Sequence, residues 1–107
     1  CKFLDKNGIN VVCAILSVSQ KDRNWCRDNM SSYSEIFVNV PISVIEKRGH
    51  RDIYMKYDKG LTKNVVGKDI KFEKPSNSDF TINNDHSKEY FIEKGNKIAK
   101  SILRNLK

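Results

Sequence analysis

The sequence predicts an α/β domain in which helices flank a parallel sheet. Two apolar, β-branched runs, at residues 9–16 and about 35–40, are typical of strands that are buried on both faces of such a sheet. A helical pattern follows each run, and the order strand, helix, strand, helix is that of a βαβ unit. With 107 residues, the chain has room for one domain with a small core.

The elements of the first part can be justified in order. Residues 1–8 are typical of the end of a helix, because Gly8 can adopt the left-handed conformation that closes one. The run 9–16 is the first predicted strand. A helix is expected next, and Ser19 can cap its first turn.

The second part adds helices and a third strand. After the strand at about 35–40, Pro41 stands where the first turn of a helix tolerates proline. A short helix is predicted within 50–62, where apolar side chains recur at helical spacing. The segment DFTIN, 79–83, predicts a third strand, and an apolar stripe from about Ser87 onward predicts a long helix. We expect the first two strands to be neighbours in the sheet.

The charge of the chain narrows the class of partner. The formal charge is +7 and the sequence pI is about 9.4, which fits a nucleotide, a nucleic acid or a membrane surface. Lys and Arg are spread along the chain and only thicken within 97–107, as on a solvated helix face, so a nucleic-acid partner is disfavoured. No run approaches the roughly 18 apolar residues of a membrane span and no signal-peptide pattern is present, so we expect a soluble, cytoplasmic protein with no membrane partner.

The cysteines and histidines predict no metal site. Cys1, Cys13 and Cys26 form no C-x-x-C pair, and His50 and His86 lie at no metal-ligand spacing from them. We therefore interpret the cysteines as reduced thiols of a cytosolic protein.

Four consecutive segments together resemble the C-terminal portion of the adenylyl-sulfate kinase family: GINVVCAILSVSQKDRNWCR, YSEIFVNVPISVIEKR, IYMKY and GLTKNVVGKDIKFEKP. The family patterns are a strand ending in I-S-P, K-D-R-x-x-x-R, E-V-F-V-x-x-P-L-x-V-x-E-x-R-D, K-G-L-Y-K-K-A and G-x-I-K-x-F-T-G-I-D-x-P-Y-E-x-P. The resemblance covers about residues 1–85. It implies a P-loop kinase-type three-layer sandwich that transfers the γ-phosphoryl group of ATP, as its Mg²⁺ complex, to the 3′-hydroxyl of adenylyl sulfate in sulfate assimilation.

The resemblance also implies what this sequence lacks. Family members begin with a strand, a G-x-x-x-x-G-K-[ST] phosphate loop and a D-G-D-x-x-R segment, none of which occurs here. Such a loop holds the phosphates of ATP and helps to hold Mg²⁺. We therefore expect residues 1–107 to be a single, incomplete kinase domain that is inactive alone, with its catalytic residues and its partner in the N-terminal part of the same kinase. The open sheet edge of such a fragment favours a homo-oligomer.

The resemblance implies five candidate residues for binding the acceptor. Leu16 and Ser17 match the I-S step at a strand end, where ligands bind in open α/β sheets, although Ser17 also suits a helix cap. Arg51 takes the place of the Lys in K-G-L-Y. Asn64 and Val65 match the residues before T-G-I-D, where a family ring stacks on adenine. Val65 can close an apolar pocket over a base but offers no π-face.

The segment that carries Val65 is also expected to move. Residues 60–75 are a candidate lid that closes to exclude water, and Lys63 within it can meet a phosphate. Arg23 and Arg27 match the basic positions of K-D-R-x-x-x-R. They lie four residues apart on one helix face, where they can donate to phosphate oxygens or remain as solvated surface charge.

Two more residues match the family's adenine pocket for ATP. These are Ser87 and Ile92. A helix N-cap is the alternative for Ser87, and packing in the core is the alternative for Ile92.

Two alternatives to an adenylyl-sulfate kinase stay open. The first is a related kinase that acts on a different nucleotide or nucleotide conjugate, which the missing ring at Val65 favours. The second is a small basic module, without chemistry, that binds nucleic acid or an acidic protein through its C-terminal helix.

Overall fold

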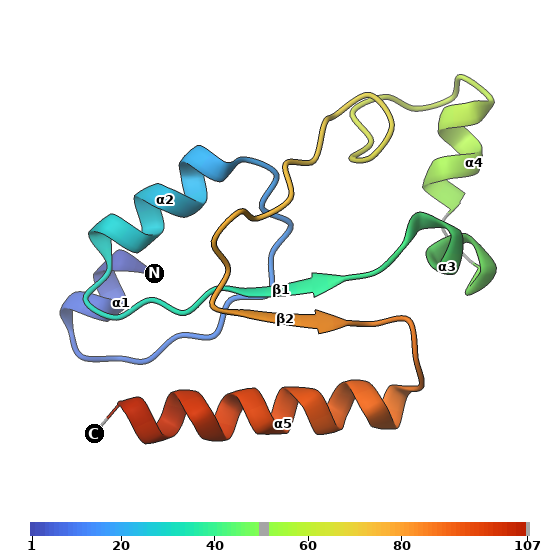
Figure 1. Ribbon diagram of the computed structural model, residues 1–107. Helices are drawn as coiled ribbons and strands as arrows, with labels where there is room; N and C mark the ends of the chain where they lie inside the picture. Colours follow the sequence, from blue (N-terminus) through green and yellow to red (C-terminus); the bar gives the residue numbers. More distant parts are fainter. Residues whose placement is uncertain (50–51, 107) are drawn as a thin grey trace.

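The computed structural model describes residues 1–49 and 52–106 of the chain. The order of elements is α/β, as predicted (Figure 1). Their bounds are α1 Lys2–Lys6, α2 Gln20–Asn29, β1 Ile36–Asn39, α3 Ile42–Lys47, α4 Asp52–Asp58, β2 Phe80–Asn83 and α5 Lys88–Asn105. Gly8 has a φ of 70°, so the predicted end of the first helix is confirmed.

β1 and β2 form a parallel two-stranded sheet. Ile36 lies opposite Phe80, and Asn39 lies opposite Asn83. The amide of Asn84 donates to the carbonyl of Asn39 at 2.8 Å and extends the ladder past the strand ends. The predicted strands at about 35–40 and 79–83 are therefore confirmed, and they are parallel neighbours.

α5 is the helix that packs beside the sheet, next to β2. It runs alongside both strands and contacts β2 (Figure 1). Ile82 in β2 is 5% exposed, and within 1–49 and 52–106 it and Val65 are the buried apolar residues that form the core. The prediction of a long amphipathic C-terminal helix is confirmed. The parallel sheet is likewise confirmed, whereas the three-layer arrangement remains a prediction.

The prediction of a strand at 9–16 is wrong. These residues form no strand or helix and belong to no sheet, and their side chains are exposed, with Val12 at 100% and Ile15 at 72%. The predicted pairing with 35–40 is wrong as well, because β1 pairs with β2. The physical reason is that a strand needs a neighbour for its backbone N–H and C=O groups, and the described part of the chain places none beside 9–16.

The helices of the described ranges show no membrane-spanning segment. None of them combines the length and the apolar character needed to cross a bilayer.

Candidate functional site

The 60–75 segment folds around the carboxylate of Asp69. This carboxylate accepts the backbone N–H groups of Asn64 at 2.8 Å and Val65 at 2.6 Å. Asn64 has a φ of 60°, a conformation that Asn tolerates better than most residues, and this directs both amides towards Asp69. A bridge between Val66 and Ile70 closes the tip. The candidate lid is therefore ordered by hydrogen bonds within the loop itself.

The pKa of Asp69 reports the balance of forces in this loop. Desolvation opposes ionisation of the carboxyl, but hydrogen bonds from backbone N–H groups, those of Asn64 and Val65 among them, outweigh it and lower the pKa from its ordinary value of 3.8. The loop is thus built on the ionised form of Asp69.

Acid is expected to loosen the loop. Because the folded-state pKa of Asp69 lies below 3.8, the carboxylate stabilises the loop above that pH, and the stabilisation is lost as the pH falls through the folded-state pKa. We expect the amide NMR signals of Asn64 and Val65 to titrate together below about pH 4. Asp69→Asn has no ionisable group and should abolish this titration. Persistence of the titration in that variant would contradict the assignment.

Val65 points inward from the loop. It is 3% exposed, the lowest value among the core residues, so the apolar side chain of this polar stretch belongs to the core. Its neighbour Gly67 approaches Ile42 and the hydroxyl of Tyr54, where a Cβ atom would lie 4.0 Å from each. Lys68 pairs with Asp58 at 3.1 Å and fastens the loop to α4. The loop thus closes over α3 and α4.

A wide, open pocket of about 510 Å³ lies on the solvent side of this loop. Lys63 contributes the cation of its lining, and Tyr57 contributes a ring. The other lining residues are Asp58, Gly60, Thr62 and Asp69. α4 and the loop that form it lie beyond the carboxyl end of β1 in Figure 1. Ligands of open α/β sheets bind at that end, so this pocket is the candidate site.

Arg23, predicted to contact phosphate, is buried and holds two carbonyl groups of the chain. It is 5% exposed. Its guanidinium donates to the carbonyl of Ser17 at 2.7 Å and to the carbonyl of Glu73 at 2.6 Å. The structure therefore joins two predicted site segments, the 16–17 turn and the 60–75 loop. Leu16, in that turn, is 68% exposed and free of the core.

Ser19 does not cap α2 with its side chain, contrary to the prediction. The carboxylate of Glu73 accepts the N–H of Gln20, the first residue of α2, at 2.8 Å. A carboxylate at this position also interacts favourably with the helix dipole. The cap of α2 is thus supplied by the end of the 60–75 loop.

Arg27 is part of an ion pair. It donates to both carboxylate oxygens of Asp79, at 3.2 and 3.0 Å, and to the carbonyl of Asn77 at 2.9 Å. The Arg27 hydrogen bond lowers the pKa of Asp79. Burial, reinforced by the charge of nearby Glu35, raises the pKa of Tyr33 to about 12. Through its hydrogen bonds to Asp79 and Asn77, Arg27 fixes α2 to the segment before β2.

The remaining predicted site residues are spread over the chain. Ser87 accepts the N–H of Tyr90 at 3.2 Å, so it caps α5, which was the alternative for this residue. Ile92 lies on α5 and is 49% exposed. Arg51 lies outside the described residues. The structure thus joins Ser17 to the end of the 60–75 loop through Arg23, and it places the two adenine candidates at the separate α5.

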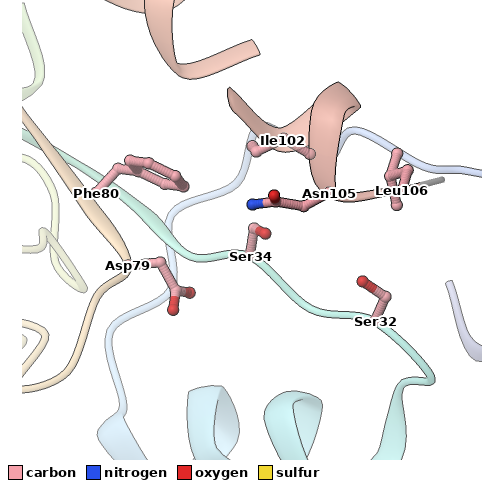
Figure 2. Close-up of a pocket in the computed structure, with 7 residues that line it drawn as sticks. All are labelled: Ser32, Ser34, Asp79, Phe80, Ile102, Asn105 and Leu106. Atoms are coloured by element: carbon pink, nitrogen blue, oxygen red, sulfur yellow. The ribbon is translucent and has the colours of Figure 1, made fainter. Parts of the chain in front are cut away.

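A smaller cavity of about 170 Å³ lies at the opposite end of the sheet, where the two strands begin. Figure 2 shows Ser34, which precedes β1, facing the last turn of α5, whereas the carboxylate of Asp79, which precedes β2, points away from that helix. The other lining residues are Ser32, Phe80, Ile102, Asn105 and Leu106. Because this is the amino end of the strands, we do not assign the site to it.

The described residues do not fit Mg²⁺. No three His, Cys, Asp or Glu side chains converge within 1–49 and 52–106. Asp69 and Glu73 accept backbone N–H groups, and Asp58, the other carboxylate of the pocket lining, pairs with Lys68. We therefore assign no Mg²⁺ ligand among the described residues.

Two residues of the site are absent from the sequence-based set, Asp69 and Glu73. Asp69 has a local signal, since a short carboxylate a few residues after Asn64 in a Gly-containing loop is suited to bind backbone N–H groups. Glu73 has no such signal. Its partners Gln20 and Arg23 lie 53 and 50 residues away in the sequence.

Comparison with known proteins decides the family. The model of the family described as adenylylsulphate kinase matches residues 1–83. This chain belongs to that family. The match includes α2, both strands and the loop around Asp69. The comparison with solved structures gives no match.

Two curated relatives illustrate what the chain is similar to. An adenylyl-sulfate kinase of Halothermothrix orenii is 31% identical over 97 residues, covering 91% of this chain and 51% of the relative. A cytidine diphosphoramidate kinase of Campylobacter jejuni is 31% identical over 83 residues, covering 78% of this chain and 48% of the relative. The chain spans about half the length of the curated relatives it matches.

Proposed function

We propose that this chain is the acceptor-binding part of a kinase that transfers the γ-phosphoryl group of ATP to the 3′-hydroxyl of a nucleotide, with adenylyl sulfate as the first candidate. ATP is the donor that membership in a kinase family implies. The observation that carries the proposal is the matched loop, which folds around Asp69 and leaves Lys63 on the wall of an open pocket. In this role the ammonium group of Lys63 binds the anionic part of the acceptor.

A second acceptor class is favoured by Val65. Where the family places a ring that stacks on adenine, this chain has a buried aliphatic side chain that offers no π-face. One relative of similar identity is named for cytidine diphosphoramidate. A nucleotide conjugate other than adenylyl sulfate, phosphorylated by the same chemistry, is therefore the competing proposal.

Acceptor kinetics separate these proposals. The complete kinase that contains this chain is assayed with ATP, using adenylyl sulfate, cytidine diphosphoramidate and plain 5′-nucleotides as acceptors. We expect kcat/KM for one of the two conjugates to exceed that for the plain nucleotides by about tenfold or more. Lys63→Ala should raise the KM of that acceptor and leave the KM of ATP unchanged, whereas the same substitution of the exposed Lys100 on α5 should change neither. Transfer to none of these acceptors would reject both proposals.

We also propose a partner for the open edge of the sheet. β1 has β2 on one side, and on its other side the described residues offer no strand. Ile36 and Val38 of β1 are 42% and 43% exposed, and the apolar 9–16 segment is exposed as well. The rest of the family fold is the occupant we propose, because the chain spans only about half of its relatives. A strand from it would pair with the backbone N–H and C=O groups on the open edge of β1 and complete a three-layer domain.

Self-association is the competing occupant of this edge. A second copy of the chain can cover the same apolar residues, which is the basis for proposing a homo-oligomer. Sedimentation of the 107-residue chain and of the complete kinase distinguishes the two. If the edge is filled from within the complete kinase, only the shorter chain should associate through it.

A further inference from the structure

Arg23 occupies a position that a charged residue rarely takes. Its side chain is 95% removed from solvent, since its exposure is 5%. Its three hydrogen-bond acceptors are all uncharged oxygens, two carbonyls and the Oε1 atom of Gln20 at 3.1 Å. No partner for its Nε atom is found among the described residues. Because burial of such a group costs free energy, its placement calls for a geometric reason.

The geometry of the guanidinium supplies that reason. A planar fork can donate in two fixed directions at once, which a lysine ammonium cannot do with the same rigidity. One nitrogen of Arg23 reaches Ser17, six residues before it, and the other reaches Glu73, 50 residues after it. The fork therefore sets the distance between the 16–17 turn and the end of the 60–75 loop.

Further hydrogen bonds close the same junction. The N–H of Glu73 donates to the carbonyl of Val18 at 3.0 Å, and its carboxylate accepts the N–H of Gln20 at 2.8 Å. The side chain of Gln20 in turn accepts the N–H of Ser76 at 3.1 Å. We call the four residues Ser17, Gln20, Arg23 and Glu73 the clasp. The clasp joins the start of α2, the turn before it and the loop end into one unit.

We infer that Arg23 is a positioning residue for the acceptor: it does not touch the nucleotide, but it holds the Ser17 turn and the 60–75 loop at the spacing that the acceptor requires. This inference rests on the proposed function of the loop. It also implies that any closure of the loop is confined to residues before Glu73, because the clasp fixes the rest.

The test uses two variants in the complete kinase and in the 107-residue chain. Arg23→Lys keeps the charge but loses the fork, and Glu73→Ala removes the cap of α2 while leaving the carbonyl that Arg23 binds. We expect Arg23→Lys to raise the acceptor KM by about tenfold or more, with the KM of ATP within about twofold of wild type. Glu73→Ala should change the acceptor KM in the same direction by a smaller factor. In the chain, both should speed hydrogen exchange at the amides of Asn64 and Val65.

Asp79→Asn is the matched control. It weakens a different attachment of α2, the ion pair with Arg27, and leaves the clasp intact. We expect it to lower stability without a selective change in acceptor KM or in exchange at the loop. If the clasp variants behave like Asp79→Asn, or raise the two KM values equally, the positioning role is overturned. If wild-type kinase transfers no phosphoryl group to any nucleotide, the proposed function fails, and exchange at the loop then decides whether the clasp orders it.

Discussion

Replacing Val65 by alanine is expected to lower the free energy of unfolding by about 2 kcal/mol, as removal of a buried aliphatic side chain does in other cores. Val65 is 3% exposed, and the chain has few buried apolar residues to compensate for the loss. Val12→Ala is the same chemical change at a residue that is 100% exposed, and it should alter the stability by less than about 0.5 kcal/mol.

Urea unfolding of the 107-residue chain measures this difference. The midpoint of Val65→Ala should fall, with the slope of the transition unchanged, whereas the midpoint of Val12→Ala should match that of wild type. Equal effects of the two substitutions would mean that the 60–75 loop does not contribute to the core. The inward position of Val65 would then be wrong.

The same Val12 is expected to become intolerant of charge in the complete kinase. If the 9–16 segment is covered there by the proposed partner strand, Val12→Asp buries a carboxylate and should destabilise the complete protein by about 3 kcal/mol or more. In the 107-residue chain, where Val12 is exposed, the substitution should cost less than about 0.5 kcal/mol. We thus predict that Val12→Asp lowers the stability of the complete kinase much more than that of the 107-residue chain.

Thermal and urea unfolding of both proteins test the prediction for Val12→Asp, with Asn96→Asp as the control. Asn96 lies on the exposed surface of α5, so this substitution adds one negative charge without burying it. The Asn96→Asp substitution should change the stability of either protein only slightly. A Val12→Asp variant of the complete kinase that is as stable as the Asn96→Asp variant would exclude a covered strand at 9–16.

The elements that sequence alone predicts well are those with a local cause. The long helix α5 has an apolar stripe of helical period and a serine that accepts the N–H of Tyr90, and both features lie within the helix and its cap. Asp69 is not among the residues predicted from the sequence, but its cause is also local, since its partners Asn64 and Val65 are five and four residues away. Periodicity and turn chemistry are sufficient for such features.

Features that depend on distant residues could not be predicted in the same way. The composition of 9–16 is that of a strand, but composition does not say whether a neighbouring strand is present to satisfy its backbone. Arg23 and Arg27 show the same limit. Their spacing on one helix face is consistent with phosphate contact, yet their partners Glu73 and Asp79 lie 50 and 52 residues away. Only the tertiary structure brings those groups together.

The parallel pairing of β1 with β2 has a consequence for how the chain folds. Asn39 and Asn83 face each other although 44 residues separate them, and the whole 60–75 loop lies within that interval. Closing so long a segment costs conformational entropy before the hydrogen bonds between the strands have formed. Contacts of this kind therefore form slowly. Helix α5, whose contacts are local, can form on a much shorter timescale. We therefore expect the 60–75 loop to acquire its final conformation in the slow step of refolding, together with the sheet, and long after the C-terminal helix.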